Sequence, residues 1–296
     1  MSKVVSPSPI VAVGAAQTRF ASLVAMARRN MLIVVPGAML ALMAFIAIFA
    51  PYLGTVDPTS LNPAARLQDP SAAHWFGTDM LGRDLYSRVI YGSRVSLIVG
   101  LSVAFFSSVA GLVVGMMSGF IRWLDPIIMR IMDGMMSIPP ILLAIALVAL
   151  TGGSMQNVII AITIAEIPRT TRLVRSVVLS VREEPYVDAA VTAGSSTPKI
   201  LLKHILPNTV APITVQATYV CAAAMIAESI LSFIGAGLPP IVPSWGNIIA
   251  DARSLWQMKP LMIFFPALFL SICVLAVNLL GDGLRELIDP RLVKGQ

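Results

Sequence analysis

The sequence predicts an all-α integral membrane protein with about six transmembrane helices. Of its 296 residues, 57% are hydrophobic and 12% are charged, whereas soluble domains carry roughly 25% charged residues. The apolar residues gather in long runs, and a run of about 20 residues can cross the hydrocarbon layer of a bilayer as a helix. These two observations argue strongly against a soluble fold.

Six apolar runs are expected to cross the membrane. They cover residues 31–50, 95–120, 127–150, 158–167 with an amphipathic extension to 179, 210–234 and 261–280. The first run is too long for a secretory signal peptide, and no small-x-small cleavage site follows it, since Ile48 and Pro51 border its end. We therefore interpret it as a retained span.

The runs divide the chain into four parts. Residues 1–30 are expected to form a cytoplasmic N-terminal tail, and residues 31–93 the first transmembrane helix with an outer loop. Residues 94–283 form the core transmembrane domain, which includes a cytoplasmic loop at 185–207. Residues 284–296 form a cytoplasmic C-terminal tail.

The basic residues set the orientation, because Lys and Arg are retained on the cytoplasmic side during insertion. With both termini inside the cell, the cytoplasmic segments hold most of the Lys and Arg residues, including those of the stretch 169–182. The outer segments hold only Arg66, Arg83, Arg88, Arg253 and Lys259, with Arg94 at a boundary. The net charge of +6 is therefore mostly a topology signal, and a nucleic-acid partner is not expected.

Neither the cysteines nor the histidines predict a metal site. Cys221 and Cys273 lie inside predicted spans, where they are expected to act as small apolar residues. His74 falls in the first outer loop and His204 in the cytoplasmic loop, on opposite sides of the membrane.

Two outer segments carry candidate functional side chains. The stretch from His74 to Asp84 mixes Trp and Phe with turn-forming Gly and Asp, which favours a folded hairpin at the outer interface over a plain linker. Its candidate residues are Trp75, Asp79, Arg83 and Asp84. In the second segment, 235–260, Trp245 is either an interfacial anchor or part of a gate or of a contact with another protein.

The cytoplasmic loop between the fourth and fifth spans is expected to form two short helices. Pro185 suits a first helical position, and Gly194 can take the left-handed conformation that ends a helix. Thr197 then caps a second helix that begins at Pro198 and ends at Pro207, because proline cannot continue the hydrogen-bond ladder. Two such helices at nearly a right angle would make a knob that fits a socket on a separate soluble protein. The alternative is an amphipathic hairpin that rests on the lipid headgroups.

The spacing within this loop resembles the EAA loop of ABC importer permeases. That pattern runs Glu-Ala-Ala, three residues, Gly, nine residues, Ile, one residue, Leu-Pro. The matching positions are Asp188, Ala189, Ala190, Gly194, His204, Leu206 and Pro207. Asp188 stands in place of the family's Glu, and His204 in place of its Ile. The resemblance implies that the loop is the coupling element that contacts a transport ATPase.

Further motifs resemble the dipeptide, oligopeptide and nickel branch of these permeases, and most of all its second, C-type subunit. They occur in the same order and cover roughly residues 31–291. They are Phe76-Gly77-Thr78-Asp79, Leu81-Gly82-Arg83-Asp84, His204-Ile205-Leu206-Pro207-Asn208, Leu231-Ser232-Phe233-Ile234-Gly235, Pro243-Ser244-Trp245-Gly246-Asn247, and Asn278-Leu279-Leu280-Gly281-Asp282-Gly283-Leu284-Arg285. The resemblance implies a type I ABC importer permease fold.

The resemblance also implies an assembly in the bacterial cytoplasmic (inner) membrane. The partners would be a homologous permease subunit, two ATPase subunits and an extracytoplasmic substrate-binding protein. The chain has no Gly-x-x-x-x-Gly-Lys-Ser/Thr phosphate loop, so it is expected to bind no cofactor, with ATP and Mg on the partner ATPase. We therefore expect a non-catalytic permease subunit for di- or oligopeptides, with glutathione-like peptides, opines, sugars and nickel as alternatives.

Charged residues inside spans are candidates for function by default, because they are costly in the membrane. Glu228 in the fifth span and Glu166 in the fourth are candidates for the translocation path, and Glu166 can also pair with Arg169 three residues on. Asp133 is expected to pair with the arginine three residues before it or to lie at the interface. Asp282 is expected to fix the end of the sixth helix.

A stripe of small residues lies in the second span. Gly111, Gly115 and Gly119 recur at four-residue intervals, which favours close approach of another helix. That helix belongs either to the partner permease or to this chain.

Two other classes of protein compete with an importer permease. An ion-coupled secondary transporter would use intramembrane carboxylates such as Glu228, but neither a fixed-period nor an inverted repeat is visible. A membrane enzyme would need a convergent nucleophile, base or metal set, and the sequence shows no His-Glu-x-x-His or Gly-x-Ser-x-Gly motif.

Overall fold

The computed structural model of the chain describes residues 31–288. The tail expected over residues 1–30 lies outside the described residues, as does the 289–296 part of the expected C-terminal tail. The described residues form helices and no β-strand, and Thr78 and Asp84 make an isolated antiparallel bridge. The prediction of an all-α fold is confirmed.

Long helices alternate with short ones along the chain. The helices of the described residues are α2 (Met31–Ile48), α3 (Leu85–Phe120), α4 (Asp125–Met136), α5 (Pro140–Thr151), α6 (Met155–Arg182), α7 (Pro185–Thr192), α8 (Thr197–Ile200), α9 (Leu206–Phe233), α10 (Trp245–Ala252) and α11 (Leu261–Ile288). Short 3-10 turns η1 (Ala50–Tyr52) and η2 (Pro63–Ala65) lie between α2 and α3, and a π-helical turn, η3 (Leu201–Ile205), joins α8 to α9.

Four segments of the described chain are long and apolar enough to cross a membrane: α2, α3, the continuous segment Thr197–Phe233 and α11 up to Leu287. The pair α4 and α5 adds a fifth if it counts as one span. Helix α6 has 28 residues and is about 42 Å long. Its second half is more polar, because it carries Arg169, Arg172, Arg175 and Arg182. The predicted number of about six spans is therefore approximate.

The third predicted span, 127–150, is not one straight helix. Helices α4 and α5 meet at an angle of 87°, and Pro139 between them is extended, with φ −52° and ψ 132°. A residue before a proline is disfavoured in the helical region, whereas Pro140 suits the first position of a new helix. The pair Pro139-Pro140 therefore divides the predicted span into two helices, and the bent pair is either one broken span or a re-entrant loop.

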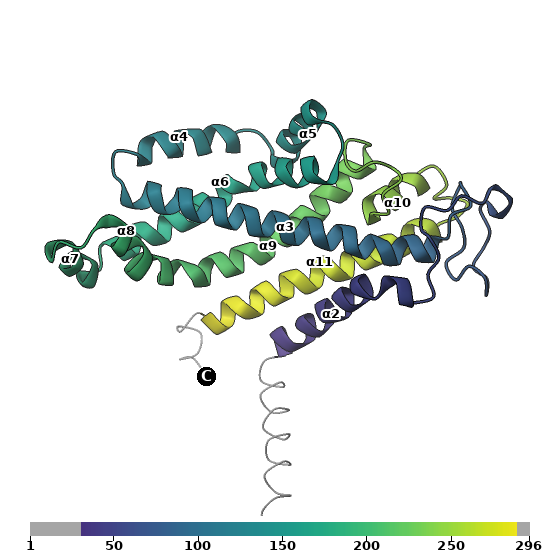
Figure 1. The fold of residues 1–296 in the computed structure, drawn as a ribbon, viewed down its shortest axis with the longest axis horizontal. Coiled ribbons are helices and arrows are strands. Elements are labelled where there is room, and N and C mark those ends of the chain that lie inside the picture. The colour runs from purple at the N-terminus through teal and green to yellow at the C-terminus, as the bar shows by residue number, and fades with distance from the viewer. Residues whose placement is uncertain (1–30, 289–296) are drawn as a thin grey trace, which may run out of the picture.

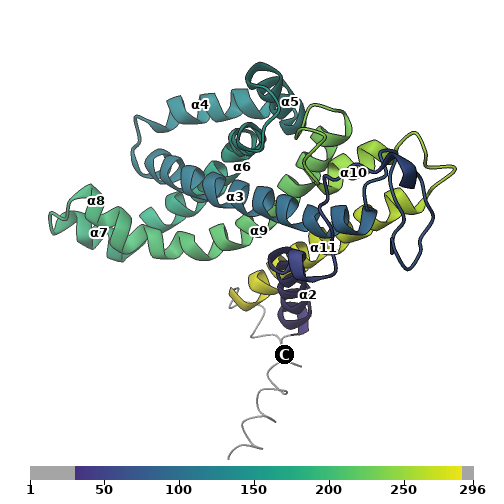
Figure 2. The same cartoon turned by 45° about the vertical axis from the view of Figure 1, so that its right-hand side comes forward.

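The long helices lie lengthwise in one bundle, and the short elements lie at its two ends (Figure 1). Helices α7 and α8 project at one end, here called the knob end, whereas α10 and the loop 49–84 lie at the opposite end, the loop end (Figure 2). Helices α2 and α11 pack together along one edge, and α4 and α5 lie at the other edge beside α6. The two predicted outer segments thus share one end of the bundle.

Close packing of α3 against α6 forms the spine of the bundle. A Cβ added at Gly111, Gly115 or Gly119 would lie 2.6 Å from the Cβ of Thr170, Val174 or Val178, respectively. Real Cβ atoms do not approach so closely, so only glycine permits this contact. The stripe of small residues therefore packs within this chain, which settles the alternative that the sequence left open.

Replacing Gly115 with Leu is expected to lower the free energy of unfolding by at least about 1–3 kcal/mol, because the new side chain overpacks the contact with Val174. Thermal unfolding in detergent measures the change. Gly37→Leu is the matched control, since Gly37 is also helical but has no atom within 4 Å of an added Cβ. Equal losses in both variants would contradict the proposed role of the α3–α6 contact.

Candidate functional site

The knob begins as the sequence predicts. Pro185 starts α7 after the extended residue Glu184, and the helix ends before Gly194, whose φ is +74°. The backbone N–H of Ser195 donates to the carbonyl of Ala190 at 3.0 Å, which closes the last turn in the manner of a glycine helix cap. The predicted first helix is therefore confirmed.

The second half of the knob differs from the prediction in two ways. The helix-capping position is Ser196 rather than Thr197, and the helix does not end at Pro207. Instead, α8 continues through η3 into α9, so that Thr197–Phe233 is one continuous segment. In η3 the N–H of Leu206 donates to the carbonyl of Leu201, and this wider turn makes room for a proline ring that would clash in a regular helix.

The knob is fixed to the bundle by its own apolar cluster. Val187 of α7, Ile200 of α8 and Ile205 of η3 are at most 2% exposed and pack with Val174 and Val178 of α6. The apolar face of the knob is therefore buried against the protein itself. These contacts continue the α3–α6 spine and hold the knob against α6.

Large apolar side chains remain on the outer surface of the knob. Tyr186, Val191 and Leu202 are 44%, 53% and 62% exposed. Of the predicted coupling positions, Asp188, Ala189, Gly194 and Pro207 are exposed, whereas Ala190, His204 and Leu206 are half-buried. The structure thus brings all seven positions onto one projecting element, with an apolar outer surface of the kind that marks protein–protein contacts.

The loop end is ordered by backbone pairing. The N–H of Leu67 donates to the carbonyl of Asp79 at 3.1 Å, and the N–H of Thr78 to that of Gln68, also at 3.1 Å. The expectation of a folded segment rather than a linker is confirmed. Near its start, the Thr59 hydroxyl and backbone N–H donate to Asp57, which lowers the pKa of that carboxyl.

A network of four charged groups ties this loop to α3 and α10. Asp79 Oδ2 lies 2.6 Å from Arg83 Nε and 2.7 Å from Arg88 Nη1. Asp251 Oδ2, from α10, lies 2.8 Å from Arg83 Nη2 and 2.9 Å from Arg88 Nη1. Arg88 is fully buried and Asp79 is 1% exposed. Two positive and two negative groups therefore balance one another, with Asp79, Arg83 and Arg88 buried and Asp251 partly exposed.

Sequence reasoning found only part of this network. Asp79 and Arg83 were candidates, whereas Arg88 and Asp251 were missed. Arg88 carried a usable signal, since it stands beside Val89 and Ile90 at the start of an apolar run, where a charge needs a partner. Asp251 carried no such signal, because it is 163 positions from Arg88 in the sequence and no local pattern predicts their contact.

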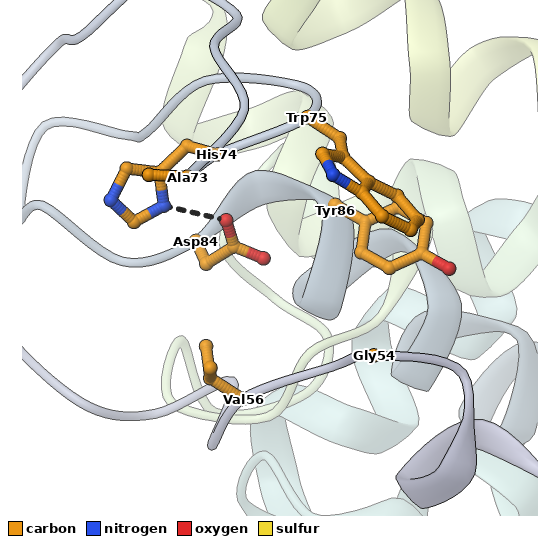
Figure 3. A pocket seen from close by; sticks show the side chains of 7 residues that line it. All are labelled: Gly54, Val56, Ala73, His74, Trp75, Asp84 and Tyr86. Atoms are coloured by element: carbon orange, nitrogen blue, oxygen red, sulfur yellow. Dashed lines mark hydrogen bonds and ion pairs between the residues drawn. The ribbon is translucent and has the colours of Figure 1, made fainter.

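Asp84 and Trp75 lie at a small cleft beside this network (Figure 3). Asp84 Oδ2 accepts from the N–H of Ser87 at 2.8 Å and so caps α3, while His74 Nδ1 lies 2.8 Å from Oδ1. Trp75 is 58% exposed, and its ring lies 4.7 Å from that of Tyr86. The cleft has a volume of about 50 Å³, which suits a few waters and is too small for a peptide.

Trp245 is a structural side chain of the interior. It is fully buried, and its Nε1–H donates to the carbonyl of Val89 at 3.0 Å. An interfacial anchor must reach the headgroup region, so that alternative is excluded for Trp245. Its neighbour in α10, Asn247, donates to the carbonyls of Pro239 and Val242 at 2.9 and 3.0 Å, which fixes the preceding loop.

The two candidate path carboxylates are both buried within the subunit. Glu228 of α9 is 0% exposed, and its Oε1 accepts from the Ser232 hydroxyl at 2.9 Å. Glu166 of α6 is 7% exposed and lies 3.6 Å from Arg169 Nη1, as its spacing predicts. Each has an Oε2 without a hydrogen-bond donor among the described residues. Their role in the path stays a prediction.

Two other membrane carboxylates have different partners from those expected. Asp133 pairs with Arg172 of α6 at 2.6 Å rather than with its own helix. Asp282 accepts from the Tyr219 hydroxyl of α9 at 2.5 Å, and α11 continues past it to Ile288. The expected pair between Asp133 and its own helix and the expected helix end at Asp282 were therefore wrong, because the partners come from helices distant in sequence.

A bundle of apolar helices with a fixed knob at one end and a loop held by ion pairs at the other is typical of a membrane protein that spans the bilayer several times. Residues 107–294 match the family described as binding-protein-dependent transport system inner membrane component. The chain belongs to that family.

Known relatives extend the match over most of the chain. A probable peptide ABC transporter permease protein of Sinorhizobium fredii is 52% identical to this chain. The match covers 91% of this chain and 92% of that protein. The dipeptide transport system permease protein DppC of Alkalihalophilus pseudofirmus is 43% identical, covering 90% and 88%. The glutathione transport system permease protein GsiD of Pectobacterium atrosepticum is 40% identical, covering 89% and 88%.

A solved structure shows the same fold. An inward-facing conformation of the MetNI methionine ABC transporter matches with a TM-score of 0.57 at 20% identity, over 68% of this chain and 96% of that chain. The predicted type I ABC importer permease fold is therefore confirmed. The chain is a multi-pass, non-catalytic permease subunit of an ABC importer, a class of subunit that works with an ATPase and a binding protein.

Replacing Asp79 with Asn is expected to lower the free energy of unfolding by about 3–5 kcal/mol, because it leaves two buried guanidinium groups with one carboxylate. Thermal unfolding in detergent measures the loss. Asp69→Asn is the matched control: Asp69 pairs with Lys259 at 2.5 Å, but its side chain is 80% exposed, and such a pair contributes about 0–1 kcal/mol. A loss for Asp79→Asn no larger than the control's would argue against a buried network.

Proposed function

We propose that this chain forms half of the translocation path of an ATP-driven, binding-protein-dependent importer of di- and oligopeptides. Its partners are a homologous permease subunit, two ATPase subunits that bind ATP and Mg, and an extracytoplasmic substrate-binding protein. Relatives named for peptide, dipeptide and glutathione transport support the substrate class.

The observation that carries the coupling proposal is the knob. Its outer surface combines the exposed Asp188, Ala189 and Gly194 with apolar side chains such as Val191 and Leu202. Nothing lies within 4 Å of a Cβ placed on Gly194, so a partner protein can approach the backbone there. Because the knob packs on α6, closure of the ATPases around ATP would move it with the spans, as a rigid-body change between inward- and outward-facing states.

The orientation follows from charge. We place the knob end and both termini on the cytoplasmic side of the bacterial inner membrane, because Arg182, Lys199, Lys203 and Arg285 lie toward the knob end of their helices and positive residues favour that side. The loop end then faces outward, where a binding protein delivers substrate. The apolar spans between the two ends contact the lipid bilayer.

Replacing Gly194 with Trp is expected to leave the protein in the membrane but to reduce its binding to the ATPase subunits at least about tenfold, as expected when a central contact is lost. The bulky side chain would stand where the partner approaches, and the φ of +74° adds about 1–2 kcal/mol of local strain. Co-purification of the ATPase with the permease measures the effect.

Gly194→Asn is the matched control for this variant. Asn tolerates the left-handed conformation and adds a small polar side chain, so ATPase binding should stay close to that of the parent. Undiminished binding by Gly194→Trp would show that the knob is not the coupling surface.

Peptide uptake into membrane vesicles is expected to require ATP and both ATPase subunits, because these subunits are the only partners proposed to act on the knob. Radiolabelled di- and tripeptides, delivered by the binding protein, give the readout. Vesicles made without the ATPase subunits are the control, and uptake into them would rule out the proposed function. The ligand that co-purifies with the binding protein would identify the substrate.

A further inference from the structure

Helices α4 and α6 share a strip of exposed polar side chains. On α4 the strip consists of Arg130 and Asp133, with Ser137 directly after the helix, and on α6 of Arg169, Arg172 and Ser176; all are exposed. Both sets are spaced i, i+3 and i+7, which places each set on one helical face. Asp133 and Arg172 join the two faces through their 2.6 Å ion pair, and the two helices lie side by side (Figure 1). We call these six residues the polar strip.

The polar strip lies along α6 and not at its last turn. Arg172 is ten residues before Arg182, where α6 ends, which corresponds to about 15 Å along the helix. The opposite face of α6 is packed on α3, where Thr170, Val174 and Val178 are buried. The exposed face of α6 is therefore the one face free to meet lipid, water or another subunit.

Lipid is the least favourable of these surroundings. Charged side chains within a membrane face the bundle interior or a water-filled cavity, because exposure to hydrocarbon is costly. By contrast, the exposed residues of α3 at the same level are apolar: Val113 and Met117 are 48% and 38% exposed. The chain thus presents one apolar and one polar surface at the same depth.

The buried carboxylate of Glu166 lies next to Arg169 of the strip. Glu166 is 7% exposed and lies 3.6 Å from Arg169 Nη1, and its Oε2 has no hydrogen-bond donor among the described residues. It is therefore suited to orient the Arg169 guanidinium, whose side chain is 52% exposed. With Arg130 and Arg172, the surroundings hold three guanidinium groups against the two carboxylates of Glu166 and Asp133, which leaves a net positive charge.

We propose that the polar strip lines the water-filled path of the importer and takes carboxylate groups of the passing peptide on Arg169 and Arg172, with Glu166 as a positioning residue. Guanidinium groups bind carboxylates through two parallel hydrogen bonds, and every unmodified peptide carries a terminal carboxylate. The proposal rests on the proposed function and adds to it a contact within the membrane.

The first test measures whether water reaches the polar strip, and it uses the complete reconstituted transporter. The two buried cysteines, Cys221 and Cys273, are first replaced by Ala. Ser176→Cys places a thiol on the strip, and Met117→Cys places one at the same level of α3, since Gly115 meets Val174 and Gly119 meets Val178. An impermeant thiol reagent added from the knob side should react at least about tenfold faster with Ser176→Cys. Equal rates, or a slower reaction at Ser176→Cys, would overturn the proposal.

Charge selectivity is the second test. Uptake of Ala-Glu-Ala and Ala-Lys-Ala is compared for the parent transporter, Arg172→Gln and Asp133→Asn. Arg172→Gln should lower the ratio of acidic to basic peptide uptake about fivefold, the effect of one exposed ion pair. Asp133→Asn breaks the same α4–α6 pair but should leave this ratio unchanged or raise it, because it frees a guanidinium group.

The outcomes separate this inference from the proposed function. Equal losses of both peptides in the two variants would mean that the ion pair only holds α4 against α6, and the carboxylate role would be wrong. If the parent transporter takes up neither peptide although its ATPase subunits bind, the peptide assignment itself fails, and the carboxylate contact with it. The thiol reactivity then still decides whether the strip faces water.

Discussion

The close approach of α3 to α6 is the contact on which the rest of the structure depends. Three glycines leave no side chain between the helices, so that Thr170, Val174 and Val178 lie directly against the α3 backbone. This contact turns one face of α6 inward and leaves its arginine-bearing face outward. It also continues into the cluster that holds the knob, so the position of the knob depends on the same two helices.

The two ends of the bundle are held by different kinds of interaction. At the knob end, Val187, Ile200 and Ile205 bury apolar area against α6, a contact without strong directional demands. At the loop end, the carboxylates of Asp79 and Asp251 fix two buried arginines at defined distances. An interior charge network holds one arrangement and penalises others, since any unpaired member would be a buried charge.

Charged side chains along the helices fall into two groups by their surroundings. Glu166 and Glu228 are buried within the subunit, whereas Arg172 and Asp133 form an ion pair on its surface. Asp125 belongs to the paired group as well, with Arg175 donating to both of its oxygens at 2.5 and 2.6 Å. Only the exposed group can be contacted from outside this subunit without a rearrangement of its helices.

The sequence by itself determined the helical class, the apolar runs and the local form of the knob, because length, hydrophobicity and proline or glycine positions act over a few residues. The spacing of Asp188, Gly194 and Pro207 also predicted a coupling loop, and that role stays a prediction. Tertiary structure alone decided the partners: Asp251 for Arg88, Arg172 for Asp133, and α6 for the glycine stripe. Those contacts join residues distant in sequence, and no local pattern encodes which helix face meets which. The same reason explains why Pro207 did not end its helix, since the π-helical turn depends on how the knob packs against α6.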